Sequence, residues 1–88
     1  MYVVTKILGN LHETESLALD VQRLDKEHKV ERVHIPFHDA GRRRLRVTTD
    51  HGLHVGVDLS DSEPLQDGDV LTGAEGTDRL IVIEIAPS

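Results

Sequence analysis

The feature that most constrains the fold is an alternation of apolar and polar residues on both sides of a short turn. Leu45 and Val47 alternate with arginine and threonine before the turn, and apolar residues recur at every second position over 53–59 after it. Successive side chains of a strand point to opposite faces, so each segment would have one apolar and one solvated face. The turn at 49–52 ends in Gly52, which can adopt the positive φ that closes such a turn. These residues are therefore predicted to form a β-hairpin.

The hairpin needs further strands, since each buried Val or Leu contributes roughly 1.5–3 kcal/mol while ordering costs about 1.5 kcal/mol per residue. Segments 2–8, 30–37, 69–71 and 79–86 are rich in β-branched or aliphatic residues and supply them. The last of these is almost continuously apolar, which predicts a central strand. Pro36 cannot donate a ladder hydrogen bond, so the strand before it is predicted to lie at a sheet edge.

Within 30–37 the alternation predicts Val33, Ile35 and Phe37 on one apolar face, with Arg32 and His34 opposite. The polar segment 11–29 is expected to be a loop with about two helical turns, because three of its apolar residues lie at helical spacing and Ser16 could cap them. A hairpin turn is expected at 73–78. The predicted fold is all-β: a small domain of about six strands in two short sheets or a partly open barrel.

Composition narrows the class of protein further. The chain has 88 residues, no cysteine, two aromatic residues and a net charge of −6. Residues 1–88 are expected to form a single domain with an aliphatic core. Absence of cysteine removes disulfide and thiolate metal chemistry and fits a cytoplasmic location. No signal-peptide pattern opens the chain and no apolar run approaches the roughly 20 residues of a membrane span.

Arginines in the hairpin form the clearest cluster of charge. Arg42, Arg44 and Arg46 alternate along the predicted polar face, whereas the whole chain is acidic. They are either the ordinary solvated side of a strand or a basic patch that docks an acidic partner. Nucleic-acid binding is not expected, because the net charge is negative and no aromatic residues interleave the arginines. With the predicted edge strand, the candidate docking residues are Arg42, Arg44, Arg46, Arg32 and His34.

The six histidines invite a metal-binding interpretation, but their spacing does not build a site. His34 and His38 are separated by Pro36 on a strand and cannot share a face as they would on a helix. His51 and His54 could meet weakly but lack an obvious third ligand. We therefore expect no metal ligands and no tightly bound cofactor. The chain also lacks recognisable catalytic motifs, so no catalytic residue is predicted and the protein is expected not to be an enzyme.

Several motifs in fixed order resemble a known family. They are RxR at 44–46, TTDxG at 48–52, VGVxL at 55–59 and LQDGDVL at 65–71. Their order and spacing resemble the N-terminal domain of the UreE-type urease accessory proteins, the nickel chaperones of urease maturation. The resemblance extends to residues 3–10 and 80–87 and is weakest over 11–29.

This resemblance implies a protein-interaction domain that docks apo-urease or other urease accessory proteins. Nickel is implied only by the resemblance, because metal capture and dimerisation in that family belong to a C-terminal domain that would begin where this chain ends. Whether the chain is a domain of a longer protein or a stand-alone relative stays open. Two alternatives also stay open: a stand-alone histidine-bearing nickel or zinc carrier or buffer, and a UreE-like domain recruited to a non-urease complex.

Overall fold

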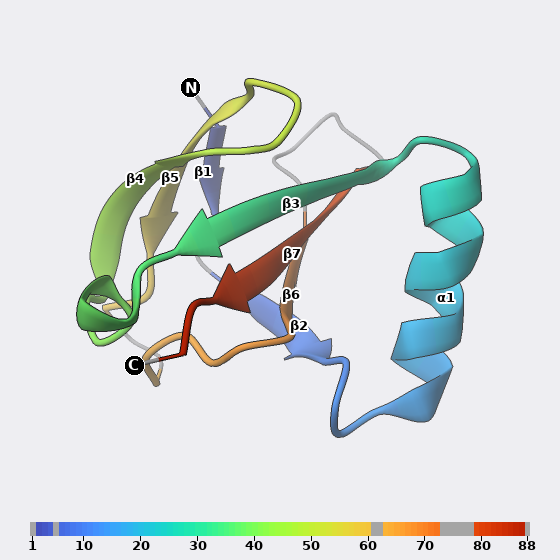
Figure 1. The fold of residues 1–88 in the computed structure, drawn as a ribbon, viewed down its shortest axis with the longest axis horizontal. Helices are drawn as coiled ribbons and strands as arrows, with labels where there is room; N and C mark the ends of the chain where they lie inside the picture. The colour runs from blue at the N-terminus through green and yellow to red at the C-terminus, as the bar shows by residue number, and fades with distance from the viewer. Residues whose placement is uncertain (1, 5, 61–62, 73–78, 88) are drawn as a thin grey trace.

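The computed structural model describes residues 2–4, 6–60, 63–72 and 79–87. Over these residues the chain forms mostly strands, with one α-helix and one 3-10 turn (Figure 1). In chain order the elements are β1 (Tyr2–Val4), β2 (Ile7–Asn10), α1 (Glu15–Lys26), β3 (Val30–Ile35), η1 (Phe37–Asp39), β4 (Arg44–Thr48), β5 (His54–Asp58), β6 (Asp69–Thr72) and β7 (Leu80–Ile85). The expected hairpin turn at 73–78 lies outside the described residues.

The strands form two mixed sheets, ordered β1-β5-β4 and β2-β6-β7-β3. The β4–β5 hairpin pairs antiparallel, with Arg46 opposite Gly56 at its middle, and Gly52 has a φ of 83° in its turn. In the larger sheet, β7 lies between β6 and β3, and β3 is at the edge. The structure thus confirms a small β domain of two sheets, a central last strand and an edge strand before Pro36.

The first strand differs from its prediction. The sequence predicts one strand over 2–8, but the chain forms β1 in the smaller sheet and β2 in the larger one. Val4 is 3% exposed in the core between the sheets, whereas Ile7 pairs with Leu71 of β6. The chain therefore passes from one sheet to the other within a segment whose composition alone favours a single strand.

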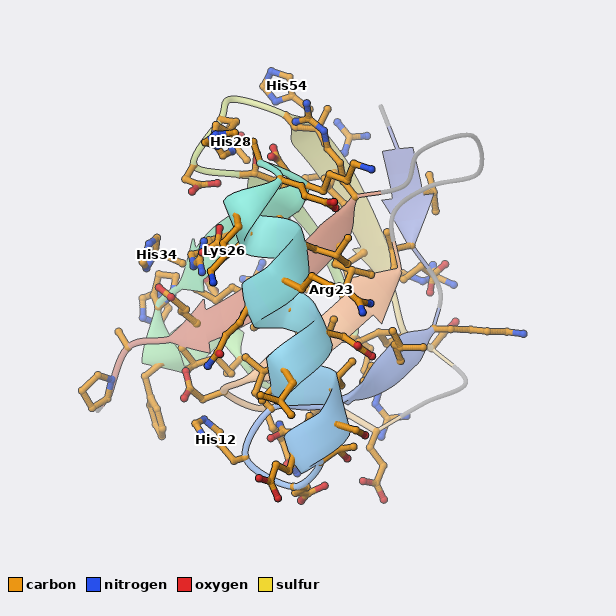
Figure 2. All side chains as sticks on the ribbon, turned by 90° about the vertical axis from the view of Figure 1, so that its right-hand side faces the viewer. His12, Arg23, Lys26, His28, His34 and His54 are labelled. Carbon is orange, nitrogen blue, oxygen red and sulfur yellow. The ribbon has the colours of Figure 1, made fainter. Side chains whose placement is uncertain are left out.

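Segment 11–29 is more helical than predicted, since α1 has twelve residues. Leu17, Val21 and Leu24 follow helical spacing and pack with Val30, Val70 and Val82 on one face of the larger sheet. Figures 1 and 2 show α1 lying across that sheet, and Arg23 and Lys26, labelled in Figure 2, are exposed. The N-cap is Thr14 rather than Ser16, and it makes no side-chain capping bond. Packing against the sheet, which is not encoded in local propensity, stabilises this helix. It is neither long nor apolar enough to cross a membrane.

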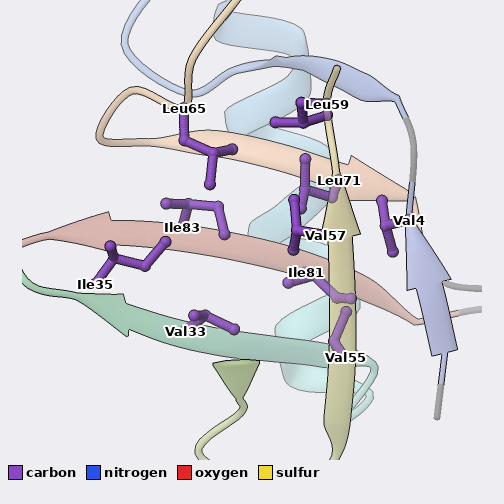
Figure 3. Close-up of a cluster of buried hydrophobic side chains, with 10 residues drawn as sticks. All are labelled: Val4, Val33, Ile35, Val55, Val57, Leu59, Leu65, Leu71, Ile81 and Ile83. Atoms are coloured by element: carbon purple, nitrogen blue, oxygen red, sulfur yellow. The ribbon is translucent and has the colours of Figure 1, made fainter. Parts of the chain in front are cut away.

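The main core lies between the two sheets (Figure 3). Its fully or almost fully buried members are Val4, Val33, Ile35, Val55, Val57, Leu59, Leu65, Leu71, Ile81 and Ile83. Val33 and Ile35 point into this core as predicted, but Phe37 does not and is 57% exposed. Pro36 ends β3, and the 3-10 turn that follows carries Phe37 out of the alternation. This correction removes Phe37 from the predicted core.

Candidate functional site

The outer face of the smaller sheet carries the predicted arginine cluster. Along β4, Leu45 and Val47 pack towards the core, while Arg44 and Arg46 are exposed on the opposite face. The pairing register places Val3, Gly56 and Arg46 in one row across the three strands. An open hollow of about 450 Å³ lies beside this row, and Val3, Gly56, Asp58 and the three arginines line it. Val3 is 56% exposed, so this surface combines an exposed apolar side chain with arginines.

The arginines of this face differ in their ion pairs. Arg42 Nε lies 3.4 Å from Asp39 Oδ1, and Arg44 Nε lies 3.5 Å from Asp58 Oδ1. Hydrogen bonds donated by Ser60 lower the pKa of Asp58, and Arg44 lowers it further, so this carboxylate stays ionised beside Arg44. Arg46 has no ion pair with any residue in the described part of the chain. Its guanidinium is therefore the one most readily available to a partner's carboxylate.

Arg32 and His34 do not join this cluster. Arg32 donates through both terminal nitrogens to Asp25 of α1, at 3.2 Å each, and His34 Nδ1 lies 3.0 Å from Glu84 Oε2. The pKa of Asp25 is lowered, first by its hydrogen bond from Arg32. The five predicted docking residues thus form two groups, and the second group is already paired with carboxylates. Arg44 and Arg46 lie on β4 and Arg42 precedes it in the loop, contrary to its predicted place on the strand, whereas Arg32 and His34 lie on β3.

The histidines contact different parts of the fold. Figure 2 shows His12, His28, His34 and His54 at separate places on the surface. His12 contacts Asp67 at 3.1 Å, and His54 Nδ1 lies 3.3 Å from the Thr48 hydroxyl. His51 is the exception, because it contacts a buried residue that the sequence interpretation missed.

That residue is Glu31, whose side chain is fully buried. One carboxylate oxygen accepts a 2.8 Å hydrogen bond from the Thr49 hydroxyl. The other accepts a 3.1 Å bond from Arg79 and lies 2.7 Å from His51 Nδ1. Asp50 adds a second carboxylate 3.2 Å from the same imidazole nitrogen. A signal for this cluster was present in the alternation, because residue 31 shares the inward register of Val33 and Ile35 and an acid there requires partners.

The donor atoms of Glu31, Asp50 and His51 lie within 4.8 Å of one another, a set that divalent metal ions use. However, Arg79 and Thr49 already bond both oxygens of Glu31, and Asp50 Oδ1 accepts the backbone N–H of Arg32 at 2.9 Å. A dication at Glu31 would lie close to the guanidinium of Arg79, which contacts the carboxylate at 3.1 Å and would repel the metal ion. The arrangement fits a metal poorly and instead fastens the turn of the β4–β5 hairpin to β3. We refer to Glu31, Thr49, Asp50, His51 and Arg79 as the clasp.

The fold and the outer-face arginines together define a small two-sheet β domain that presents charged groups on exposed strands. The family model described as "UreE urease accessory protein, N-terminal domain" matches residues 4–86. The chain therefore belongs to the UreE urease accessory protein family, as the sequence motifs indicate, and corresponds to its N-terminal domain.

Curated relatives agree with this assignment. The urease accessory protein UreE of Arthrobacter sp. (strain FB24) is 40% identical over 98% of this chain and 51% of its own length. The proteins of the same name from Kocuria rhizophila and Micrococcus luteus are 32% and 41% identical, over 98% and 80% of this chain and 56% and 40% of their own lengths. This chain thus spans about half the length of the curated relatives it matches.

Proposed function

We propose that this chain is the protein-interaction domain of a urease accessory protein, which docks apo-urease or other accessory proteins during nickel insertion. Membership of the family and the names of the relatives, all urease accessory proteins, support the urease connection. The observation that carries the docking surface is Arg46, an exposed cation that has no ion pair among the described residues and lines the same hollow as the exposed Val3. The proposed role is non-catalytic, and we place it in the cytoplasm, where a chain without cysteine needs no oxidising conditions.

The charge of this surface indicates the charge of its partner. Arg42, Arg44 and Arg46 lie together on a chain whose net charge is −6, and Asp39 and Asp58 pair with the first two, which leaves Arg46 as the unbalanced positive charge of this patch among the described residues. Exposed charges contribute little affinity individually, but complementary patches raise the association rate and orient the encounter. The proposed partner surface is therefore acidic, with an apolar group to cover Val3.

A pull-down with matched variants tests this proposal. The chain is immobilised, exposed to a lysate rich in urease, and the retained proteins are identified by mass spectrometry. Replacing Arg44 and Arg46 with alanine should reduce recovery of urease subunits or accessory proteins about tenfold, equivalent to about 1.4 kcal/mol of binding free energy. The matched control replaces Arg23 and Lys26 of α1, which also removes two exposed cations, one of them in an ion pair.

Undiminished recovery with the Arg44→Ala/Arg46→Ala variant would contradict docking through the basic face. Equal losses in both double variants would show that net charge, rather than this surface, governs binding. Failure to retain any urease protein from a lysate in which they are abundant would remove the urease assignment. Recovery of an unrelated complex through Arg44 and Arg46 would favour recruitment of the domain outside urease maturation.

A second candidate function is that of a nickel or zinc carrier. One observation favours it: potential ligand atoms of Glu31, Asp50 and His51 lie within 4.8 Å of one another. Since Arg79 and Thr49 already bond both Glu31 oxygens, we expect calorimetric titration with Ni²⁺ to give a dissociation constant of about 1 mM or weaker. A one-to-one site at about 1 μM, abolished by His51→Gln and retained by His28→Gln, would contradict this expectation and favour the carrier. His28 is an exposed histidine outside the clasp and serves as the control.

A further inference from the structure

We infer that the partner binds as an added strand along the open edge of β4, through an extended segment that alternates acidic and aliphatic side chains. This inference rests on the proposed function and deepens it by naming the chemistry and conformation of the docked segment. Four observations carry it: the hydrogen-bonding phase of β4, the state of the other sheet edges, the side chains on its two faces and the groove beside it.

The hydrogen-bonding phase of β4 follows from the bonds at its two ends. Leu59 N–H donates to Arg43 O at 2.6 Å, and Thr49 N–H donates to Leu53 O at 2.9 Å. In an antiparallel pair, directly bonded residues alternate along the strand, and the register between these ends is unbroken. The odd-numbered residues of β4 therefore bond β5. The N–H and C=O groups of Arg44, Arg46 and Thr48 point away from β5, and none of them bonds a residue that the structure describes.

The other sheet edges are less suited to accept a strand. On β3, the backbone N–H of Arg32 donates to Asp50 Oδ1 at 2.9 Å, and its carbonyl accepts the Asp50 N–H at 2.8 Å. The turn of the β4–β5 hairpin therefore occupies the backbone groups in the middle of the β3 edge, the edge strand that Pro36 predicted. β1 is three residues long, and β2 carries a register shift between Ile7 and Gly9. Among the strands described, β4 is the edge that is both regular and open over five residues.

The two faces of β4 specify the side chains of an added strand. Neighbours on its outer face would stand beside Arg44 and Arg46, where opposite charges stabilise a cross-strand pair. Neighbours on its inner face would stand beside the apolar side chains of Leu45 and Val47. A groove of about 310 Å³ lies along this edge, and both apolar residues (Ile35, Pro36) and polar ones (Asp39, Thr48) line it. An acidic–aliphatic alternation matches both faces. A second copy of β4 does not, because its arginines would oppose these arginines, and like charges across a pair are destabilising.

Hydrogen exchange with a synthetic peptide tests the inference. The probe is an acetylated and amidated heptapeptide in which three glutamates alternate with two valines between terminal serines. When it saturates the chain, the amides of Arg44, Arg46 and Thr48 should exchange at least about tenfold more slowly, because each gains a hydrogen bond. Saturable binding without protection of these three amides would overturn the inference, as would the absence of binding at about 1 mM peptide.

Backbone methylation separates strand addition from attraction between charges. Two versions of the probe are N-methylated at alternate residues, one in each phase. Only one phase places methyl groups towards β4, so one version should bind at least about tenfold more weakly while the other binds as the parent. Equal affinities would overturn strand addition. A peptide of the same composition with its glutamates contiguous should also bind at least about tenfold more weakly, since alternation is lost.

A variant of the chain removes a hydrogen-bond donor from β4 instead of from the peptide. Thr48→Pro keeps both arginines and removes one outward N–H, a position where an edge strand tolerates proline. Thr48→Pro should lower the affinity for the parent peptide about tenfold, whereas Thr48→Ala should leave that affinity within about twofold of the unsubstituted chain. If Thr48→Pro does not fold, the two methylated probes decide alone.

The proposed function and this inference fail in different ways. Urease proteins retained through Arg44 and Arg46, without peptide protection of the β4 edge, would leave the docking function standing and overturn strand addition. Protection of the edge by the peptide, with no urease protein retained, would support strand addition and remove the urease assignment.

Discussion

Replacing Glu31 with alanine is expected to lower the free energy of unfolding by about 3 kcal/mol. Glu31 is fully buried and bonds Thr49, His51 and Arg79, and breaking a buried charged pair typically costs about 3–5 kcal/mol. The lower end applies because His51 and Arg79 are 53% and 47% exposed, so water can solvate them once the carboxylate is gone. Thr49 is 4% exposed and would lose the acceptor of its hydroxyl.

Urea unfolding of the variant and of a matched control measures this effect. Glu84→Ala is the control, because Glu84 also contacts a histidine and an arginine but its side chain is 42% exposed. Surface pairs of that kind contribute about 0–1 kcal/mol, so the unfolding midpoint of the control should fall far less. Equal midpoints for the two variants would show that the clasp does not stabilise the fold. Faster exchange of the Asp50 amide in Glu31→Ala would show that the hairpin turn has separated from β3.

The hairpin was predictable because two local properties determine it. Alternation over residues 44–59 sets both strands and their faces, and the positive φ of Gly52 sets the turn between them. The apolar run of β7 likewise indicated burial on both faces, and the structure confirms its central position. Each of these features depends on neighbours in the sequence.

The features that escaped prediction depend on pairing across the chain. β1 belongs to the smaller sheet because Tyr2 pairs with Val55 in a parallel ladder, which no local pattern in residues 2–8 encodes. The full length of α1 depends on packing with Val70 and Val82 of strands that come much later. Tertiary contacts override weak local preferences in both cases.

The candidate site shows the same division. The outward direction of Arg44 and Arg46 followed from alternation, but the separation of Arg32 from them required Asp25 and Asp50 to be placed in space. The open edge of β4 also depends on where the turn docks, since the same turn closes β3. A sequence pattern can therefore identify an exposed strand, whereas only the assembled sheets show which backbone edge is free.

The second large effect is expected in the core between the sheets, at Ile83. This side chain is fully buried on the central strand of the larger sheet, so Ile83→Ala should lower the free energy of unfolding by about 2–5 kcal/mol through lost burial and a residual cavity. A domain of this length has a total stability of about 4–13 kcal/mol, so the loss is a large fraction of it. The exposed Leu19→Ala is the control and should change stability by less than about 0.5 kcal/mol.

Amide exchange at both sheets in Ile83→Ala decides whether the docking surface depends on this core. The inner face of the smaller sheet, with Val4, Val55 and Val57, packs against the larger sheet in one cluster that contains Ile83. We therefore expect amides of β5 and β7 to lose protection together and by similar factors. Retained protection at Val57 with loss at Ile83 would contradict this, since it would mean that the smaller sheet holds its structure alone. If both sheets lose amide protection together, Ile83→Ala on the larger sheet would abolish docking at β4 without altering any residue of the docking surface.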